Sequence, residues 1–137
     1  EALRALAAEL GLAGRIDWLG TCGPEAMEAA YAAATVQVLP SRVKENSPLT
    51  VLEAGVRGRP SIVSHHGGSP ELVDPPRRGW SFPPEAVPAL TAALEAAAAD
   101  PAEAQRRGAR MKEWVQAECD PERHWDRIAA VYEELGA

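Results

Sequence analysis

The sequence predicts a single α/β domain with a parallel sheet and helical crossovers. Segments with the composition of strands alternate with segments of helical periodicity through the first half of the chain, and proline or glycine lies at most of the boundaries. Such alternation is typical of parallel sheets whose strands are joined by helices. At 137 residues, of which 46% are hydrophobic, the chain is long enough to bury a core.

Four short segments are expected to form the strands. Each contains β-branched or aromatic residues and is bounded by glycine, proline or a polar turn. We expect strands over residues 15–19, 35–39, 60–64 and 79–82. Between the last two, residues 65–69 are expected to form a polar, glycine-rich turn.

Proline near the start and glycine after the end set most of the expected helix boundaries. The pairs Asp100–Pro101 and Asp120–Pro121 each combine a capping side chain with a proline in the first turn. We expect helices over residues 2–10, 24–33, 48–56, 84–98, 101–117 and 121–135.

Composition excludes several classes of function. The net charge of −6 argues against a broad binding surface for nucleic acid or for an anionic membrane. No apolar run approaches the ~20 residues that a membrane span needs. Cys22 and Cys119 fit no CxxC pattern, so we expect free thiols in a reducing, cytoplasmic location. No signal peptide is visible, and the chain starts at Glu1 inside a helical pattern, as a piece of a longer protein would.

An anion site is predicted where the second strand leads into the third helix. In open parallel sheets ligands bind beyond the carboxyl ends of the strands. Here Ser47 is expected to cap the helix and Pro48 to take its first position. The backbone amides of Leu49 and Thr50 would then point out of the helix N-terminus and suit a phosphate, with Lys44 adding positive charge. The ordinary alternative is a helix end that binds only water.

Two carboxylates bracket this predicted anion site. Glu45 precedes the helix, and Glu53 lies inside it, about 9 Å along the helix axis from Ser47. Carboxylates accept hydrogen bonds from vicinal hydroxyls, so one could bind a sugar and the other a ribose. The alternative for Glu53 is a solvated side chain paired with Arg57. The apolar stripe expected to face the sheet consists of Val51, Leu52, Gly55 and Val56.

The turn after the third strand carries Gly67 and Gly68. Paired glycines let a backbone approach a ligand closely, although an ordinary tight turn would use them too. His65 and His66 lie beside them, but no third ligand has a convincing spacing, so we expect no metal site.

Residues 45–54 (ENSPLTVLEA) resemble the Glu-x7-Glu motif of retaining GT-B glycosyltransferases of family 4, also called group 1. Residues 36–41 and 58–63 resemble the strands that flank this motif in the family. Residues 67–73 (GGSPELV) resemble its glycine-rich loop, and residues 16–20 (IDWLG) resemble an upstream strand. Linked segments in the right order are much more specific than one pair of glutamates.

The resemblance implies roles for individual residues. Glu45 would be the catalytic residue that contacts the transferred sugar near the anomeric centre, and Glu53 would bind the ribose of the nucleotide. Leu49 and Thr50 would offer amides to the diphosphate, and Ser47 its amide to sugar hydroxyls. The further expected donor-binding residues are Lys44, Gly67 and Gly68. The family needs neither metal nor cofactor, because protein cations and the helix end stabilise the leaving diphosphate.

Two departures from the family pattern matter. Pro48 stands where the family often has glycine, which removes one possible N–H donor to the sugar. The family's first two C-terminal strands and its N-terminal acceptor domain are missing. The resemblance therefore implies an incomplete, Rossmann-like C-terminal half of a GT-B fold. We expect residues 1–83 to form a partial nucleotide-sugar-binding domain and residues 84–137 to add its C-terminal helices.

The leading functional hypothesis is sugar transfer from a nucleotide-sugar, such as a UDP- or GDP-sugar, to an acceptor. Either the remaining strands close up, or the missing domain or another chain completes the sheet; alone, this piece should be nearly inactive. A non-catalytic nucleotide-binding or assembly module is the alternative. A glycoside hydrolase using Glu45 and Glu53 would fit their spacing, but nothing visible would raise either pKa. Whether the chain forms a homo-oligomer stays open.

Overall fold

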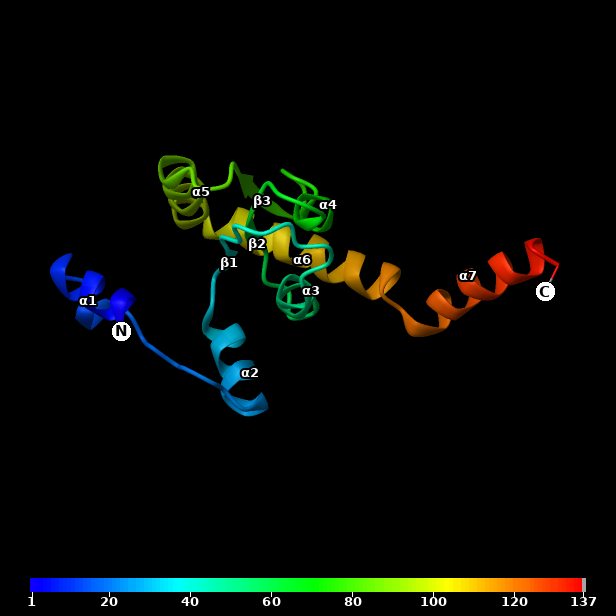
Figure 1. Cartoon of the computed structure of the whole chain (residues 1–137), viewed down its shortest axis with the longest axis horizontal. Coiled ribbons are helices and arrows are strands. Elements are labelled where there is room, and N and C mark those ends of the chain that lie inside the picture. Colours follow the sequence, from blue (N-terminus) through cyan, green and yellow to red (C-terminus); the bar gives the residue numbers. More distant parts are fainter. Residues whose placement is uncertain (137) are drawn as a thin grey trace.

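The computed structural model describes residues 1–136 and contains a parallel three-stranded sheet (Figure 1). The strands lie in the order β1–β2–β3, and their bounds are Gln37–Leu39, Ser61–Ser64 and Gly79–Phe82. Val38 lies opposite Ile62, and Ile62 lies opposite Trp80. The α/β fold with a parallel sheet and helical crossovers is therefore confirmed.

Helices account for most of the remaining chain. Their bounds are Ala2–Glu9 (α1), Pro24–Ala33 (α2), Leu49–Val56 (α3), Ser69–Val73 (α4), Val87–Ala99 (α5), Pro101–Glu118 (α6) and Pro121–Glu134 (α7). The two Asp-Pro signals are confirmed. Asp100 Oδ1 accepts from the Glu103 amide at 2.9 Å, and Asp120 Oδ1 accepts from the Arg123 amide at 3.0 Å. Local capping chemistry thus begins both C-terminal helices where the sequence predicts.

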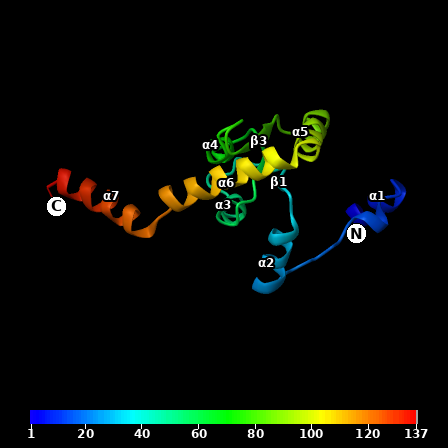
Figure 2. The same cartoon turned by 180° about the vertical axis from the view of Figure 1, so that it is seen from behind.

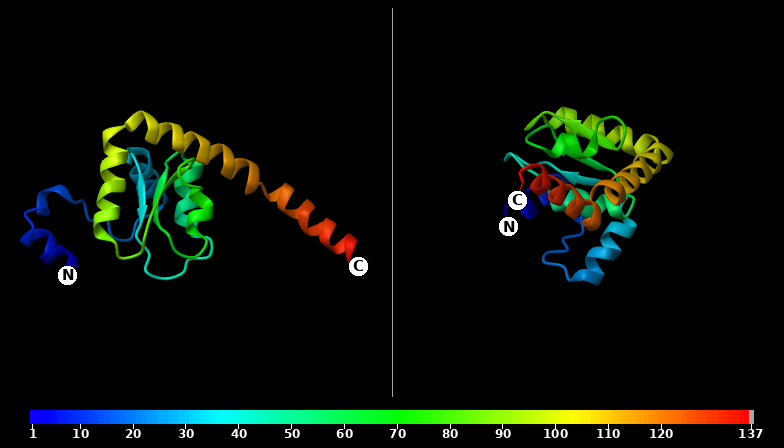
Figure 3. Two further views of the ribbon diagram at one scale, coloured as in Figure 1. Left: turned by 90° about the horizontal axis from the view of Figure 1, so that it is seen from above. Right: turned by 90° about the vertical axis from the view of Figure 1, so that its right-hand side faces the viewer.

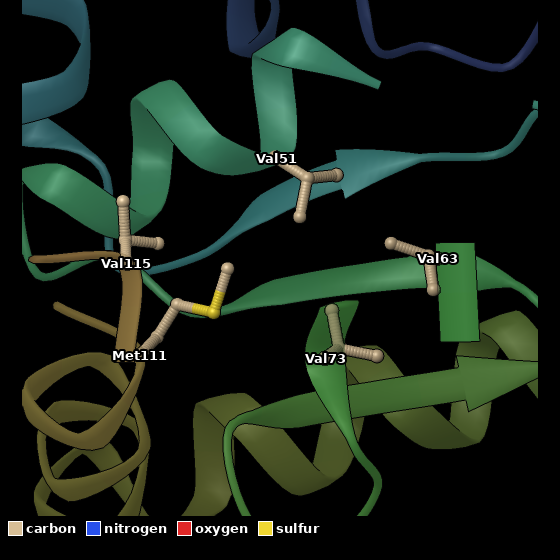
Figure 4. Packing of buried hydrophobic residues seen from close by; sticks show 5 residues of the cluster. All are labelled: Val51, Val63, Val73, Met111 and Val115. Atoms are coloured by element: carbon tan, nitrogen blue, oxygen red, sulfur yellow. The ribbon is translucent and has the colours of Figure 1, made fainter. Parts of the chain in front are cut away.

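The sheet carries a small core on each face, because successive residues of a strand point to opposite sides. On one face, Val63 packs with residues of α3, α4 and α6 (Figure 4); the buried members of this cluster are Val51, Val63, Val73, Met111 and Val115. On the other face, Ile62 packs with Phe82 and with Ala97 of α5. The central strand β2 is buried along its whole length.

The strand expected over residues 15–19 does not form. Residues Ala13–Arg15 make one turn of 3₁₀ helix, and residues 16–20 have no regular structure. A strand requires a hydrogen-bonded neighbour, and none lies beside this segment in residues 1–136. Figures 1 and 2 show α1 and the connection to α2 set apart from the sheet. The segment therefore does not pair with the remaining strands of the sheet, so the expectation that these strands close up across the gap is wrong.

Two other local expectations are corrected. The glycine-rich turn is shorter than expected, because the chain enters helix α4 at Ser69. Val73 at the end of α4 is fully buried in the core, so tertiary packing stabilises a helix too short to form alone. The helix expected from residue 84 begins at Val87, after a turn in which Glu85 has φ 61°.

Helix α7 protrudes from the body of the molecule (Figure 3). All of its residues are exposed. None of the helices within residues 1–136 has both the length and the apolar character that crossing a membrane requires.

Candidate ligand-binding site

Helix α3 begins directly beyond the C-terminal end of β1, after a loop over residues 40–48. Its N-cap is Pro48, not Ser47, and no side chain caps it. Pro48 is buried with extended backbone angles (φ −66°, ψ 114°), so its ring anchors the helix start while Ser47 stays exposed. The expected capping bond from Ser47 is therefore wrong, although the position of the helix start is correct to within one residue.

The N-terminus of α3 has unused hydrogen-bond donors. The Val51 amide bonds to the Pro48 carbonyl at 3.0 Å, whereas the Leu49 and Thr50 amides have no acceptor within residues 1–136. Leu49 and Thr50 are both exposed. Two amides at the positive end of the helix dipole are thus open to a ligand, which is the geometry that the sequence predicts for an anion site.

Glu45 is held in place within the loop that precedes this helix end. Its Oε1 accepts a hydrogen bond from Ser41 Oγ at 2.9 Å, and the Ser41 carbonyl accepts from Ser64 Oγ at 2.7 Å. Ser64 is buried at the end of β2, so the loop that carries Glu45 is tied to the central strand. Lys44 is exposed in the same loop.

Gly67 and Gly68 bring the turn after β2 against the backbone of the loop that carries Glu45. The Gly68 amide donates to the Glu45 carbonyl at 2.8 Å. A Cβ on Gly67 would lie 2.2 Å from that carbonyl oxygen, and a Cβ on Gly68 would lie 2.1 Å from the Asn46 carbonyl oxygen. The two glycines thus allow a close approach of one loop to the other, and the approach of this turn to a ligand stays a prediction.

Glu53 lies within α3 and is exposed, and Tyr31 contacts it. The Tyr31 hydroxyl lies 3.2 Å from Glu53 Oε2 and 3.4 Å from the Thr50 carbonyl oxygen. The pair between the Glu53 carboxylate and Arg57, considered as the alternative, does not form. Arg57 Nη1 donates to the Glu53 backbone carbonyl at 2.8 Å, and Arg57 Nε pairs with Glu28 at 2.6 Å.

Tyr31 is the site residue that sequence reasoning missed. It is buried on α2 and reaches α3 across 22 positions of sequence. The pKa of Tyr31 is raised above its ordinary value, first by burial and then by its hydrogen bond to Glu53 and the charge of that carboxylate. The available signal was a single large aromatic side chain in an alanine-rich helix.

The surface between α2 and α3 contains a cavity beside the site. An open cavity of about 890 Å³ lies between α2 and α3, lined by residues that include Cys22, Pro24, Met27, Glu28, Glu53 and Arg57. A smaller groove of about 560 Å³ lies on the other side of Glu53, against the junction of α6 and α7. Glu53 therefore borders two concave surfaces, either of which could receive part of an extended ligand.

The expected stripe of α3 is only partly correct. Val51 and Gly55 are buried and Leu52 is half-buried, but Val56 is 45% exposed because the helix turns Ala54 inward in its place.

Within residues 1–136 no three His, Cys, Asp or Glu side chains gather as metal ligands. His65 lies within hydrogen-bonding distance of Ser81, with Nδ1 3.2 Å from Oγ.

The chain is similar in sequence to known proteins. The family described as "Glycosyl transferases group 1" matches residues 1–114. A GDP-mannose-dependent alpha-(1-6)-phosphatidylinositol monomannoside mannosyltransferase of Mycobacterium tuberculosis is 30% identical over an alignment of 136 residues, which covers 95% of this chain and 34% of that protein. This chain thus spans about a third of the length of that curated relative.

Solved structures share the fold. Sucrose-phosphate synthase from Thermosynechococcus elongatus has a TM-score of 0.85 and 33% identity, over 97% of this chain and 33% of that one. The C-terminal domain of a glycosyl transferase group 1 family protein from Francisella tularensis has a TM-score of 0.78 and 20% identity, over 88% of this chain and 62% of that one. The described sheet and helices therefore correspond to a C-terminal-type domain of a GT-B fold.

Proposed function

The chain belongs to the glycosyl transferases group 1 family, and we propose that it is the donor-binding part of a retaining, family 4 enzyme. The enzyme would transfer a sugar from a nucleotide-sugar, such as a UDP- or GDP-sugar, to an acceptor. The name of the mycobacterial relative specifies GDP-mannose dependence, which supports a nucleotide-sugar as the donor.

The observation that carries the proposal is the free N-terminus of α3, with Glu45 in the loop before it and Glu53 inside the helix. The Leu49 and Thr50 amides would bind the diphosphate of the donor, and the helix dipole would stabilise the negative charge of the leaving group. Lys44 would add positive charge without a metal ion or other cofactor. Glu45 would contact the transferred sugar near the anomeric centre, and Ser47 would offer its amide to sugar hydroxyls.

Glu53 would accept hydrogen bonds from the ribose hydroxyls. It borders the cavity between α2 and α3, whose volume of about 890 Å³ leaves room for a nucleoside. Gly67 and Gly68 would act indirectly, by fixing the loop that carries Glu45. We further propose that sequences outside this chain supply the acceptor site and complete the sheet, so that the chain alone binds donor in a reducing, cytoplasmic compartment but transfers little sugar.

Calorimetry with UDP, GDP and their hexose conjugates tests this proposal. We expect the chain to bind at least one of these nucleotides, and Glu53→Ala to weaken that binding about tenfold or more because the ribose hydroxyls lose their acceptor. Glu95→Ala, on the exposed face of α5, is the control and should bind like the wild type. Failure of the folded chain to bind any of them would overturn the proposal.

A further inference from the structure

We propose that Tyr31 is a positioning residue, which holds the Glu53 carboxylate in the orientation that accepts hydrogen bonds from the ribose of the donor. This inference rests on the proposed function, because it assigns Tyr31 a task in the same site. It adds helix α2 to a site otherwise built from α3 and the loops at the strand ends.

The first step is the contrast in burial between the two partners. Tyr31 is only 8% exposed, whereas Glu53 is exposed at the edge of the cavity. The Tyr31 hydroxyl has one proton to donate. Its oxygen lies 3.2 Å from Glu53 Oε2 and 3.4 Å from the Thr50 carbonyl oxygen. A carboxylate has two oxygens and several acceptor positions, so Glu53 can hold this bond and still accept from a ligand.

The second step is that Tyr31 itself is fixed. The Arg57 guanidinium lies over its ring, 4.9 Å from the centroid. That guanidinium is held by Glu28 of α2 through Nε at 2.6 Å and by the Glu53 carbonyl through Nη1 at 2.8 Å. Arg57 therefore joins α2 to α3 around the tyrosine ring, so the hydroxyl has a defined place from which to donate.

The third step concerns the cost of binding. An exposed glutamate samples many rotamers, and a ligand that needs one of them must bear the loss of side-chain entropy. A hydrogen bond from a buried, fixed hydroxyl selects the rotamer in advance. Binding of a vicinal diol to Glu53 should thus be tighter with the Tyr31 hydroxyl than without it.

The test is Tyr31→Phe, which keeps the ring and its contact with Arg57 but removes the hydroxyl. Affinity is measured by calorimetry for UDP and GDP and for their 2′,3′-dideoxy forms, which lack the ribose diol. We expect Tyr31→Phe to weaken binding of the ribose nucleotide about three- to tenfold and to leave binding of the dideoxy form nearly unchanged. Tyr132→Phe, on exposed helix α7, is the matched control and should change neither.

Double substitution separates positioning from a purely structural role. In the Glu53→Ala background, Tyr31→Phe should have no further effect on UDP or GDP binding, because the group it positions is gone. Equal losses for the ribose and dideoxy nucleotides would overturn the inference, as would wild-type affinity in Tyr31→Phe. If the wild type binds neither UDP nor GDP, the proposed function fails together with the inference. If the wild type binds but Tyr31→Phe has none of the expected effects, the inference about Tyr31 fails alone.

A second measurement needs no change at Tyr31. Ultraviolet titration of the tyrosines should show that Glu53→Gln lowers the pKa of Tyr31 toward its ordinary value, because the carboxylate charge is removed and only a neutral acceptor remains. An unchanged Tyr31 titration would overturn the contact on which the inference depends.

Discussion

Gly67 sits where no other residue would fit without movement of a loop. Its φ is +61°, in the left-handed region that strains other residues, and a Cβ would lie 2.2 Å from the Glu45 carbonyl oxygen. Backbone faces backbone at this contact, so a flexible side chain cannot relieve the overlap. A single hydrogen atom in place of a side chain thus sets the position of Glu45 relative to β2.

We therefore expect Gly67→Ala to destabilise the fold by about 1–3 kcal/mol and, by displacing Glu45, to weaken binding of the nucleotide-sugar. Urea unfolding followed by circular dichroism measures the first effect, and calorimetry measures the second. Gly14→Ala is the control, because a Cβ there meets nothing within 4 Å. Similar losses in both variants would contradict the role assigned to the close loop contact.

Among the helices, α6 is joined to the sheet through the carboxylate of Glu103 in its first turn. Glu103 accepts from Arg106 Nε at 2.8 Å and from Arg107 Nε at 2.9 Å. Arg107 also donates to the Gly79 carbonyl of β3 at 2.8 Å. The hydrogen bonds from Arg106 and Arg107 lower the pKa of Glu103 from 4.5 to about 2.

This shift predicts how stability depends on pH. A carboxyl whose pKa is lower in the folded state stabilises the fold above its unfolded pKa and loses that contribution as the pH falls. For Glu103 the loss should occur between about pH 4.5 and pH 2. Urea unfolding at pH 7 and pH 3 should show a smaller decline in the free energy of unfolding for Glu103→Gln than for the wild type. For the control Glu95→Gln, the free energy of unfolding should fall as much as it does for the wild type. An equal fall in the wild type, Glu103→Gln and Glu95→Gln would contradict the role assigned to Glu103.

Helices and strands differ in how well the sequence predicts them. Helices α6 and α7 were predictable because their Asp-Pro caps act within four residues. Residues 15–19 have the composition of a strand, but a strand depends on a neighbour that local composition cannot reveal. Helix α4 depends on burial of Val73 in the core, which is equally non-local.

The candidate site also contains features that local sequence determines and features that depend on distant contacts. The sequence placed Glu45, Glu53 and the amides at the start of α3, because a motif and a helix boundary fix their order along the chain. The contact between Tyr31 and Glu53 joins two helices and depends on how α2 packs against α3. Likewise, the pairing of Arg57 with Glu28 instead of the Glu53 carboxylate could not be read from a four-residue spacing.

At the scale of the whole molecule, a compact centre carries two peripheral helical parts (Figures 1 and 3). The centre consists of the sheet with α3, α4, α5 and α6, which contribute both core clusters. In contrast, α7 and its C-cap residue expose an apolar stripe at the spacing of one helix face: Trp125, Ile128, Tyr132 and Leu135. Stability of the isolated chain should therefore reside in the centre, with α7 opening independently of it.

Removal of residues 120–137 tests this division. Because no described residue of α7 is buried, the truncation should leave the free energy of unfolding nearly unchanged. It removes the bonds of Arg123 and Arg127 to Glu118, but these ion pairs lie at the surface, where such pairs contribute little. Met111→Ala, which changes one fully buried side chain of α6, should instead cost about 2–5 kcal/mol. Urea unfolding compares the two, and a truncation as damaging as Met111→Ala would show that α7 belongs to the cooperative core.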